Sequence, residues 1–293
     1  MPSVLLATCA ELPAADEDAA VLDAALARHG VQSSWAVWTD PQVDWDTGLV
    51  VLRTTWDYTL RRDEFVTWVR SLPRVANEAP VVVWNTDKLY LGDLAAAGVP
   101  TVPTTFAPPG EPVTLPEQGE FVVKPSIGAG SRGAGRFTAD RAEAARAHAA
   151  HLHEAGRVVM VQPYLDQVDT VGETSLIYLD GRFSHAIRKG PLLPPGIAHP
   201  VQSRSLFVEE AIEPRSPRPA ELEVGNAALT VIRDRFGADQ LYTRVDLLPS
   251  AGGPVVVELE LTEPSLFLLH GPTDAADGDS PADRFAAAIA ARL

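Results

Sequence analysis

The stretch YTRVDLLPSAGGPVVVELEL, residues 242–261, contains two apolar runs separated by a turn around residues 251–253, which predicts a β-hairpin. Alternate residues of a strand point to opposite faces, so the position of the turn determines which side chains meet. The predicted cross-strand pairs are Arg244 with Glu260, Asp246 with Glu258, and Leu248 with Val256. The even-numbered face is therefore mostly charged, whereas the odd-numbered face can pack against a helix. The members of that apolar face are Val245, Leu247, Val255, Val257, Leu259 and Leu261.

Three carboxylates on the charged face, Asp246, Glu258 and Glu260, are predicted to lie close together. Cross-strand neighbours have Cβ atoms about 5 Å apart, and alternate residues of one strand are ~7 Å apart. Carboxylates at this spacing raise one another's pKa unless a cation holds them. Magnesium binds one or two carboxylates together with substrate phosphates, so the cluster predicts a site for one or two Mg²⁺ ions and a nucleoside triphosphate, with Mn²⁺ as a candidate substitute. The alternative is a solvated sheet face on which Arg244 neutralises one glutamate.

The composition is that of an acidic globular protein, with 293 residues, 46% hydrophobic residues and a formal net charge of -15. Nucleic acids and anionic membrane surfaces require a basic surface, so neither is expected as a partner. Cys9 is the only cysteine, which excludes an internal disulfide and a cysteine zinc site. The first residues lack a basic segment and the apolar runs are short, so we expect no signal peptide, no membrane span and a cytoplasmic location.

The first hundred residues alternate strand and helix patterns, which is typical of a parallel α/β sheet. The predicted strands are residues 4–7, 34–38, 48–53 and 80–84, and the predicted helices are residues 16–30, 61–72 and 86–98. Ligands of such sheets bind beyond the carboxyl ends of the strands, so Arg53 and Trp56 are candidate substrate-pocket residues. Packing at the strand end is the alternative. A Pro- and Gly-rich linker over residues 107–119 then precedes a region of hairpins and helices.

Residues 128–133, GAGSRG, match the G-x-G-x-x-G pattern, but a dinucleotide fold would open a helix directly from this loop. Because Gly135 and Phe137 precede the next helical pattern, the loop is better interpreted as a flap whose N–H groups cover phosphates. Lys124 lies in the preceding strand, FVVKP, where an ammonium group is costly to bury without an anion. A phosphate partner is therefore predicted. A surface turn and an NAD-dependent oxidoreductase are the alternatives.

In their order and spacing, these motifs together resemble the ATP-grasp ligases. They are NTDKLYL (85–91), FVVKP (121–125) with the glycine flap, VQPYL (161–165), GETS (172–175), RVDLL (244–248) and ELELTEP (258–264). The resemblance covers most of the chain and is greatest to the glutathione-synthetase/RimK-like branch, especially to the cyclo-ligase that acts on O-ureido-serine in cycloserine biosynthesis. It implies an α/β (α+β) fold. A Rossmann-like parallel sheet domain over residues 1–106 would precede an ATP-grasp domain of two α+β lobes, residues 107–168 and 169–293.

The resemblance also implies the role of each site residue. ATP would bind Lys88, Lys124, Gly130, Ser131, Gly133, Gln162, Tyr164 and Leu165, with Asp169 or Glu173 on the ribose. Asp246, Glu258 and Glu260 would bind Mg²⁺, Arg244 would stabilise the acylphosphate or oxyanion, and Arg188 and Lys189 would reach the γ-phosphate or a substrate carboxylate. The substrate side would contain His185, Glu263 and Ser265 besides the strand-end residues, although His185 also suits a plain sheet residue.

Two departures from the family pattern concern the substrate side and the number of metal ions. Glu260 occupies a metal position that is often Asn, and Glu263-Pro264-Ser265 replaces the usual Pro-Gly turn. The expected reaction is amide formation between amino acid substrates through an acylphosphate, by an enzyme that works alone or as a homodimer. Ring closure within one molecule and a non-catalytic nucleotide-binding protein remain the alternatives. The intact set of lysine, arginine and carboxylates weighs against the second of these.

Overall fold

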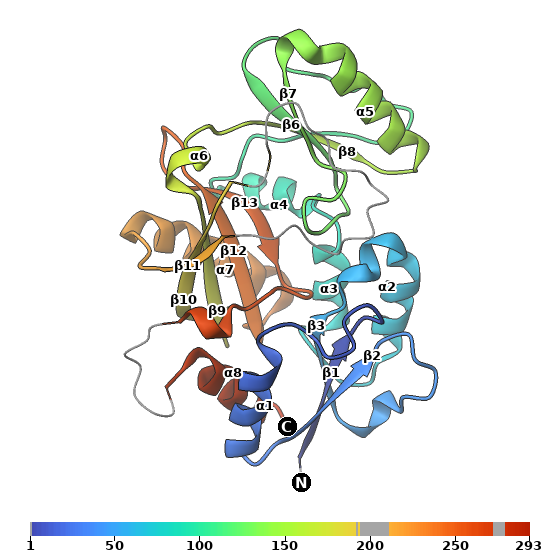
Figure 1. Cartoon of the computed structure of the whole chain (residues 1–293), viewed down its shortest axis with the longest axis vertical. Coiled ribbons are helices and arrows are strands. Elements are labelled where there is room, and N and C mark those ends of the chain that lie inside the picture. Colours follow the sequence, from blue (N-terminus) through green and yellow to red (C-terminus); the bar gives the residue numbers. More distant parts are fainter. Residues whose placement is uncertain (1, 192, 194–210, 272–278) are drawn as a thin grey trace.

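The computed structural model describes residues 2–191, 193, 211–271 and 279–293, and within them the strands form three sheets (Figure 1). The first is a parallel sheet in the order β2-β1-β3-β4. Its strands are β1 (Ser3–Thr8), β2 (Gln32–Val37), β3 (Leu49–Thr54) and β4 (Val75–Ala76). Helices α1 (Ala19–Arg28) and α8 (Pro281–Ala290) cover one face, and α2 (Arg62–Ser71) covers the other. The predicted α/β domain is confirmed, and the last helix of the chain completes its core.

One predicted strand is wrong, because residues 80–84 lie in helix α3 (Ala79–Asn85) and the fourth strand is the short β4 before it. A short apolar run cannot be assigned to a strand or to a buried helix from its periodicity. Pro80 occupies the first turn of the helix, where its missing N–H costs nothing. Val81 and Val82 are buried in two different hydrophobic cores, which explains why the apolar run 80–84 has no polar face.

The second sheet is antiparallel, has the order β5-β8-β6-β7 and carries the glycine loop. Its strands are β5 (Thr105–Ala107), β6 (Glu120–Pro125), β7 (Gly135–Thr138) and β8 (Val159–Pro163). Helix α5 (Ala142–Glu154) packs on one face of this sheet. Residues 108–119 form neither helix nor strand, as expected of a linker. Residues 126–134 join β6 to β7, so the glycine loop projects from the end of a sheet.

The third sheet has the order β11-β10-β9-β12-β13 and lies between two helical layers. Its strands are β9 (Glu173–Leu179), β10 (Arg182–Lys189), β11 (Ile212–Arg215), β12 (Tyr242–Leu248) and β13 (Val255–Glu260). Helices α4 (Tyr90–Ala96) and α7 (Pro219–Phe236) pack on one face, and α8 packs on the other. Because α8 contacts both the first and the third sheet, these two form one base. The second sheet stands above it, with the short α6 (Val168–Val171) at the junction (Figure 1).

The register of the β12–β13 hairpin confirms the two charged pairs, Arg244 with Glu260 and Asp246 with Glu258. The third pair is wrong, because a bulge after Asp246 pairs Leu248 with Val255 instead of Val256. A bulge adds one residue to one strand, so the residues of that strand beyond the bulge point to the opposite faces of the sheet. Val256 is therefore fully buried, whereas Val257 lines the cleft described below.

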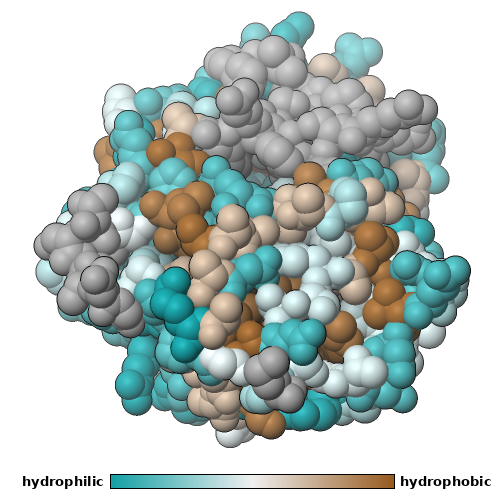
Figure 2. Space-filling model, turned by 60° about the horizontal axis from the view of Figure 1, so that its bottom comes forward, coloured by the Kyte–Doolittle hydropathy of each residue, from teal (hydrophilic) through white to brown (hydrophobic). Residues whose placement is uncertain are grey.

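Among the described residues, no helix is long and apolar enough to cross a membrane. Their large exposed hydrophobic side chains are Leu60, Leu89, Phe183 and Leu269, which are far apart in the sequence. On the face shown in Figure 2, hydrophobic residues gather in separate small patches among hydrophilic ones.

Candidate active site

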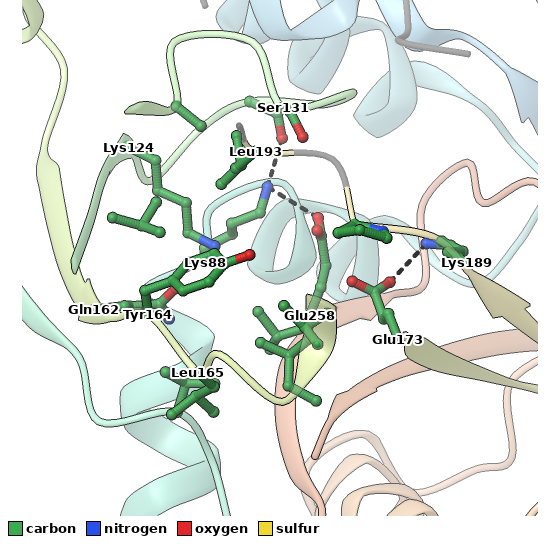
Figure 3. Close-up of a pocket in the computed structure, with 18 of the residues that line it drawn as sticks. Lys88, Lys124, Ser131, Gln162, Tyr164, Leu165, Glu173, Lys189, Leu193 and Glu258 are labelled. Carbon is green, nitrogen blue, oxygen red and sulfur yellow. Dashed lines mark hydrogen bonds and ion pairs between the residues drawn. The ribbon is translucent and has the colours of Figure 1, made fainter. Parts of the chain in front are cut away.

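A cleft lies between the second and third sheets and collects most of the residues predicted to bind ATP (Figure 3). The predicted residues that line it are Lys88, Lys124, Gly130, Ser131, Gln162, Tyr164, Leu165, Glu173, Lys189, Arg244, Glu258 and Glu260. They come from β6, the glycine loop, β8, the ends of β9 and β10, and the β12–β13 hairpin. Segments that are up to 172 residues apart in the sequence, from Lys88 to Glu260, thus meet in one cavity.

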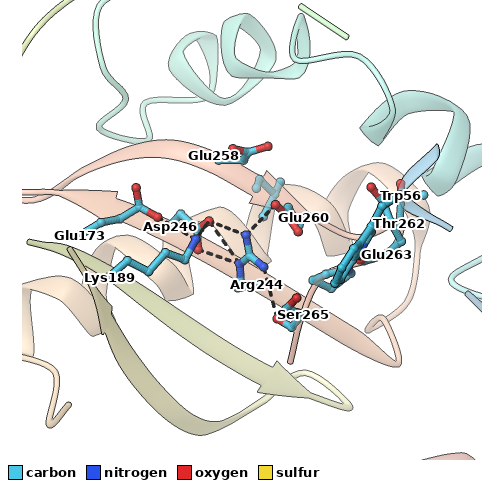
Figure 4. A network of polar contacts seen from close by, with 12 residues as sticks. Trp56, Glu173, Lys189, Arg244, Asp246, Glu258, Glu260, Thr262, Glu263 and Ser265 are labelled. Atoms are coloured by element: carbon cyan, nitrogen blue, oxygen red, sulfur yellow. Dashed lines mark hydrogen bonds and ion pairs between the residues drawn. The ribbon is translucent and has the colours of Figure 1, made fainter. Parts of the chain in front are cut away.

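The three carboxylates of the hairpin form a compact group, with one oxygen from each of Asp246, Glu258 and Glu260 within 4.8 Å of the others. Each also faces a cation of the protein. Arg244 donates from Nη2 to Asp246 at 2.8 Å and to Glu260 at 2.6 Å, and Lys189 Nζ lies 3.0 Å from Asp246 (Figure 4). An all-oxygen donor set with cations at its edge fits Mg²⁺, which prefers carboxylate and phosphate oxygens.

The same contacts set the charge state of the carboxylates. Burial opposes ionisation of Asp246, but Arg244 and Lys189 outweigh it and hold its pKa well below the usual value. Burial likewise opposes ionisation of Glu258, yet Lys88 and Lys124 lower its pKa. Burial raises the pKa of Glu260 to about 7, although Arg244 acts against this rise.

Lys88 is not the exposed helix lysine that its local sequence suggests, because it lies before α4 and is only 9% exposed. Its Nζ donates to the carbonyl of Gly128 in the glycine loop at 2.5 Å and lies 3.0 Å from Glu258 Oε1. Burial opposes its charge, but the nearby carboxylates, Glu258 first, raise its pKa. Lys88 thus links the flap to the carboxylate group.

Lys124 faces the cleft and makes no hydrogen bond or ion pair with any residue in the described ranges. Burial lowers its pKa to about 8, and Glu258 only partly compensates for this effect. A half-buried ammonium group without a protein partner is costly, and such a group is suited to an incoming anion.

The two ribose candidates differ in position. Glu173 lines the cleft and lies 2.9 Å from Lys189 Nζ. Asp169 accepts a hydrogen bond from the Tyr164 hydroxyl at 2.5 Å and lies 3.5 Å from Arg136, at the outer side of β8. The Nε2 group of Gln162 donates to Thr104 at 2.9 Å, so this end of the side chain is already engaged within the protein.

The expectation that Arg188 and Lys189 both reach the cleft is wrong for Arg188. Neighbouring residues of a strand point to opposite faces, and only Lys189 faces the carboxylates. Arg188 donates from Nε to the carbonyl of Val171 at 2.8 Å and lies 3.7 Å from Glu213. The other predicted residues do not line the cavity either, although Asp246 contacts residues that do; they are Gly133, Asp169, Asp246, Arg53, Trp56, His185, Glu263 and Ser265.

The loop after β13, residues 261–267, is held by side chains that donate to seven consecutive backbone carbonyls. The donors are Asn77 to Leu261 (2.7 Å), Tyr242 to Thr262 (2.8 Å), Trp56 to Glu263 (3.0 Å), Arg53 to Pro264 (2.9 Å), Arg244 to Ser265 (3.2 Å), and His185 to Leu266 (2.9 Å) and Phe267 (3.1 Å). We call this segment the clamped loop. The predicted substrate residues Arg53, Trp56 and His185 thus hold backbone, and Ser265 supplies a carbonyl.

His185 is 3% exposed, and burial lowers its pKa to about 4, so its ring is neutral at physiological pH. The Ser184 hydroxyl lies 2.9 Å from Nδ1, which leaves Nε2 to carry the proton that it donates to the loop. Phe267, one of the two acceptors, has φ 51°, a left-handed conformation that is costly for a bulky residue. The hydrogen bonds of the clamped loop stabilise this conformation.

Two arginines near the cleft were missed by the sequence reasoning. Arg132, in the glycine loop, lines the cleft and donates from Nη1 to Thr59 of the N-terminal domain at 3.2 Å. Arg136 stacks on the ring of Tyr164 at 3.5 Å. The sequence could have indicated Arg132, because a cation within the GAGSRG flap would help to bind phosphates. It could not indicate Arg136, because the contact of Arg136 with Tyr164 depends on how the strands pair.

Comparison with known proteins gives the family. A protein-family model described as the N-terminal domain of D-cycloserine synthetase DcsG matches residues 4–77. The cycloserine biosynthesis protein DcsG of Streptomyces lavendulae is 38% identical over 284 residues, which cover 90% of this chain and 90% of that protein. The crystal structure of D-cycloserine synthetase DcsG is similar with a TM-score of 0.88 and 35% identity over 99% of both chains.

More distant structures share the fold. D-alanine–D-alanine ligase from Bacillus anthracis, complexed with ATP, has a TM-score of 0.64 and 16% identity, and the match covers 100% of this chain and 98% of that one. The ATP-grasp ligase PsnB with its minimal precursor has a TM-score of 0.62 and 18% identity over 100% of both chains. The chain therefore belongs to the family of the cycloserine biosynthesis protein DcsG, and it shares its fold with ATP-grasp ligases.

Proposed function

We propose that this enzyme activates the carboxylate of an amino-acid-derived substrate as an acylphosphate and that a nitrogen of the same molecule then closes a ring. The observation that carries the proposal is the carboxylate group of the hairpin with its arginine and lysine partners, in a chain 38% identical to a cycloserine biosynthesis protein. Ligation between two amino acid molecules is the second candidate, because the fold is shared with D-alanine–D-alanine ligase.

The residues of the cleft suggest a division of labour. Asp246, Glu258 and Glu260 would hold Mg²⁺, and bound Mg²⁺-ATP would supply the phosphoryl group and neutralise charge during its transfer. Lys88 and Lys124 would bind phosphate oxygens, and the Gly130–Gly133 segment of the flap would cover them and exclude water. These groups position and stabilise charge, which is most of what phosphoryl transfer requires of a protein.

Other residues would recognise the rest of the two substrates. The backbone of Gln162 to Leu165 would contact adenine, and the position of Glu173 in the cleft favours it over Asp169 for the ribose. Arg244, fixed by Asp246 and Glu260, would face the oxyanion that forms when the nitrogen attacks the acyl carbon. Lys189 would carry the role that had been expected of both Arg188 and Lys189.

The test is ADP release from Mg²⁺-ATP with O-ureido-serine of either configuration and with amino acids singly and in pairs, followed by mass spectrometry of each product. Release with one substrate and a ring product supports the cyclo-ligase. Release that needs two amino acids, with a product at their summed mass less water, supports the intermolecular ligase.

Several finer expectations belong to the same proposal. Small-molecule amino acid substrates, in place of nucleic acid or membrane partners, follow from the acidic composition and the cleft. Mn²⁺ is expected to replace Mg²⁺, as carboxylate oxygens suit both ions. A cytoplasmic location, a homodimer and domain boundaries at 106 and 168 also remain proposals. Light scattering of the purified enzyme tests whether it is a homodimer. Activity measured with Mn²⁺ in place of Mg²⁺ tests whether Mn²⁺ can replace Mg²⁺.

A further inference from the structure

Glu263 lies beside the metal carboxylates but takes no part in the contacts that hold them. It follows Glu260 by three residues and is 8% exposed. Its carboxylate makes no hydrogen bond or ion pair with any residue in the part of the chain that the structure describes. The charged groups that act on it are Glu260, Lys88, Glu258 and Arg244, all members of the site. Glu263 is therefore a buried acid next to the site without a partner of its own.

The neighbouring carboxylates show how unusual this is. Asp246 pairs with Arg244 and Lys189, Glu258 pairs with Lys88, and Glu260 pairs with Arg244. Removing a carboxylate from water without a partner is costly, and most buried acids are paired for that reason. Glu263 departs from this pattern next to the site, and a carboxylate without a protein donor is free to accept one from a bound ligand.

The metal site does not supply this donor. The carboxylates whose oxygens lie within 4.8 Å of one another are Asp246, Glu258 and Glu260, and Glu263 is outside that group. Glu263 instead lies toward the N-terminal domain, together with Thr262 and Trp56, on one side of the Arg244 network (Figure 4). A donor from a bound ligand would therefore reach Glu263 on this side of the Arg244 network.

The backbone around Glu263 is fixed. Trp56 donates to the carbonyl of Glu263 at 3.0 Å, and the fully buried Arg53 donates to the carbonyl of Pro264 at 2.9 Å. Pro264 restricts the backbone further, because its φ is locked by the ring. Arg244 then donates to the carbonyl of Ser265 at 3.2 Å, so the residue that faces the oxyanion also holds this loop. The carboxylate of Glu263 is thus presented from a preorganised support.

We propose that Glu263 accepts a hydrogen bond from the N–H group of the attacking nitrogen and orients that nitrogen toward the acyl carbon. The ligand is an N–H-bearing nucleophile such as an amine or a ureido nitrogen, and the assignment rests on the proposed function. In the step itself, the nitrogen lone pair forms the C–N bond, and the bond from the acyl carbon to the phosphate oxygen breaks. Phosphate leaves with that electron pair, and the proton of the nitrogen passes to the carboxylate.

The environment of Glu263 suits an acceptor. Burial, followed by the charge of Glu260, raises the pKa of Glu263 well above its usual value. In its ionised form, an acid with a raised pKa takes up a proton more readily than one in water, which suits the geometry described above. The proposal also gives a role to the Glu-Pro-Ser sequence at residues 263–265, which departs from the family pattern, because Glu263 is the proton acceptor.

The experiment compares wild type with Glu263→Gln and Glu263→Ala, with O-ureido-serine as the probe. Trapping with hydroxylamine reports the acylphosphate as a hydroxamate, and mass spectrometry reports the ring product. In both variants we expect hydroxamate formation within about threefold of wild type and a ring product reduced by about 10²-fold, the usual range for the loss of one proton acceptor. The ratio of ADP to ring product then rises from one to above ten, because the acylphosphate hydrolyses.

Two further variants serve as controls. Glu260→Gln removes a predicted metal ligand and should lose both hydroxamate and product. Asp23→Asn changes a half-buried acid that accepts hydrogen bonds from Ser33 and Trp35 in the N-terminal domain. This variant should keep both hydroxamate formation and the ring product. Melting curves of every variant show whether it folds.

The two proposals fail in different ways. A ratio that stays at one in a folded Glu263→Gln, with an unchanged KM for O-ureido-serine, overturns the role of Glu263 alone. A wild-type enzyme that forms hydroxamate from none of the carboxylates tested contradicts the proposed function, and the role of Glu263 falls with it.

Discussion

The nucleotide side of the cleft and the clamped loop are stabilised in opposite ways. On the nucleotide side, charged side chains meet one another, as in the pairs of Lys88 with Glu258 and Lys189 with Asp246. In the clamped loop, side-chain donors meet backbone carbonyls, as Arg53 and His185 do. Charge pairs can exchange partners when phosphates and a metal ion arrive, whereas carbonyl contacts keep the backbone in place. The comparison separates residues that bind ligands from residues that position the loop.

The largest expected effect is on the nucleotide side. Asp246→Asn removes the carboxylate that both Arg244 and Lys189 contact, so we expect ADP release to fall by about 10³-fold or more, a typical loss for a metal or electrostatic ligand. The Tm should fall as well, because two buried cations lose a partner. Steady-state ADP assays and melting curves measure both effects. Activity within tenfold of wild type would show that the carboxylate group does not serve the reaction.

An intermediate effect is expected in the clamped loop. His185→Ala removes the donor to Leu266 and Phe267, so we expect kcat to fall by about tenfold with an unchanged KM for ATP, because a displaced loop impairs orientation of the nucleophile. His185→Gln keeps an N–H donor and should restore most of kcat. Kinetics with varied ATP and varied substrate separate these effects. A Gln variant as slow as the Ala variant, with a raised KM for the substrate, would instead indicate direct substrate contact.

A further effect of similar size concerns pH. The pKa of Lys124 in the free enzyme is lowered to about 8, so the lysine is charged below pH 8 and loses its proton above it. Phosphates bind the charged form, so the affinity for ATP should fall by up to about tenfold per pH unit above pH 8. Titration of ATP binding between pH 6.5 and 9.5 tests this, with Lys124→Arg as the control that stays charged. A wild-type affinity that is constant up to pH 9.5 would contradict a phosphate contact by Lys124.

The smallest effect is expected for Arg188. Its side chain contacts Val171 and Glu213 on the face of β10 away from the carboxylates. Arg188→Ala should therefore leave kcat and both KM values within about twofold of wild type, since partly exposed ion pairs contribute little. The same assays with Lys189→Ala as the paired variant sharpen the contrast. A loss above tenfold for Arg188→Ala would show that β10 presents both residues to the site.

The sequence allowed the metal group to be predicted because strand alternation and turn position determine which hairpin residues meet. The same rule failed one residue later, at the bulge after Asp246, which no local signal marks. Helix α3 was missed because an apolar run buried between two cores shows no periodicity. The clamped loop could not be predicted, since its donors come from three strands, one turn and one loop that are far apart in the sequence, and they act on backbone carbonyls. The strand-end position of Arg53 and the family resemblance around His185 had indicated a substrate role, because neither reveals which backbone groups a side chain will meet.

The central claim is that this cleft transfers phosphate from ATP to a substrate carboxylate before the C–N bond forms. The most direct measurement is ¹⁸O transfer from a labelled substrate carboxylate to the released inorganic phosphate, followed by mass spectrometry with O-ureido-serine and with amino acids. One ¹⁸O atom per phosphate, in wild type and not in Glu258→Gln, is the predicted result. Phosphate released without the label, while product still forms, would contradict an acylphosphate.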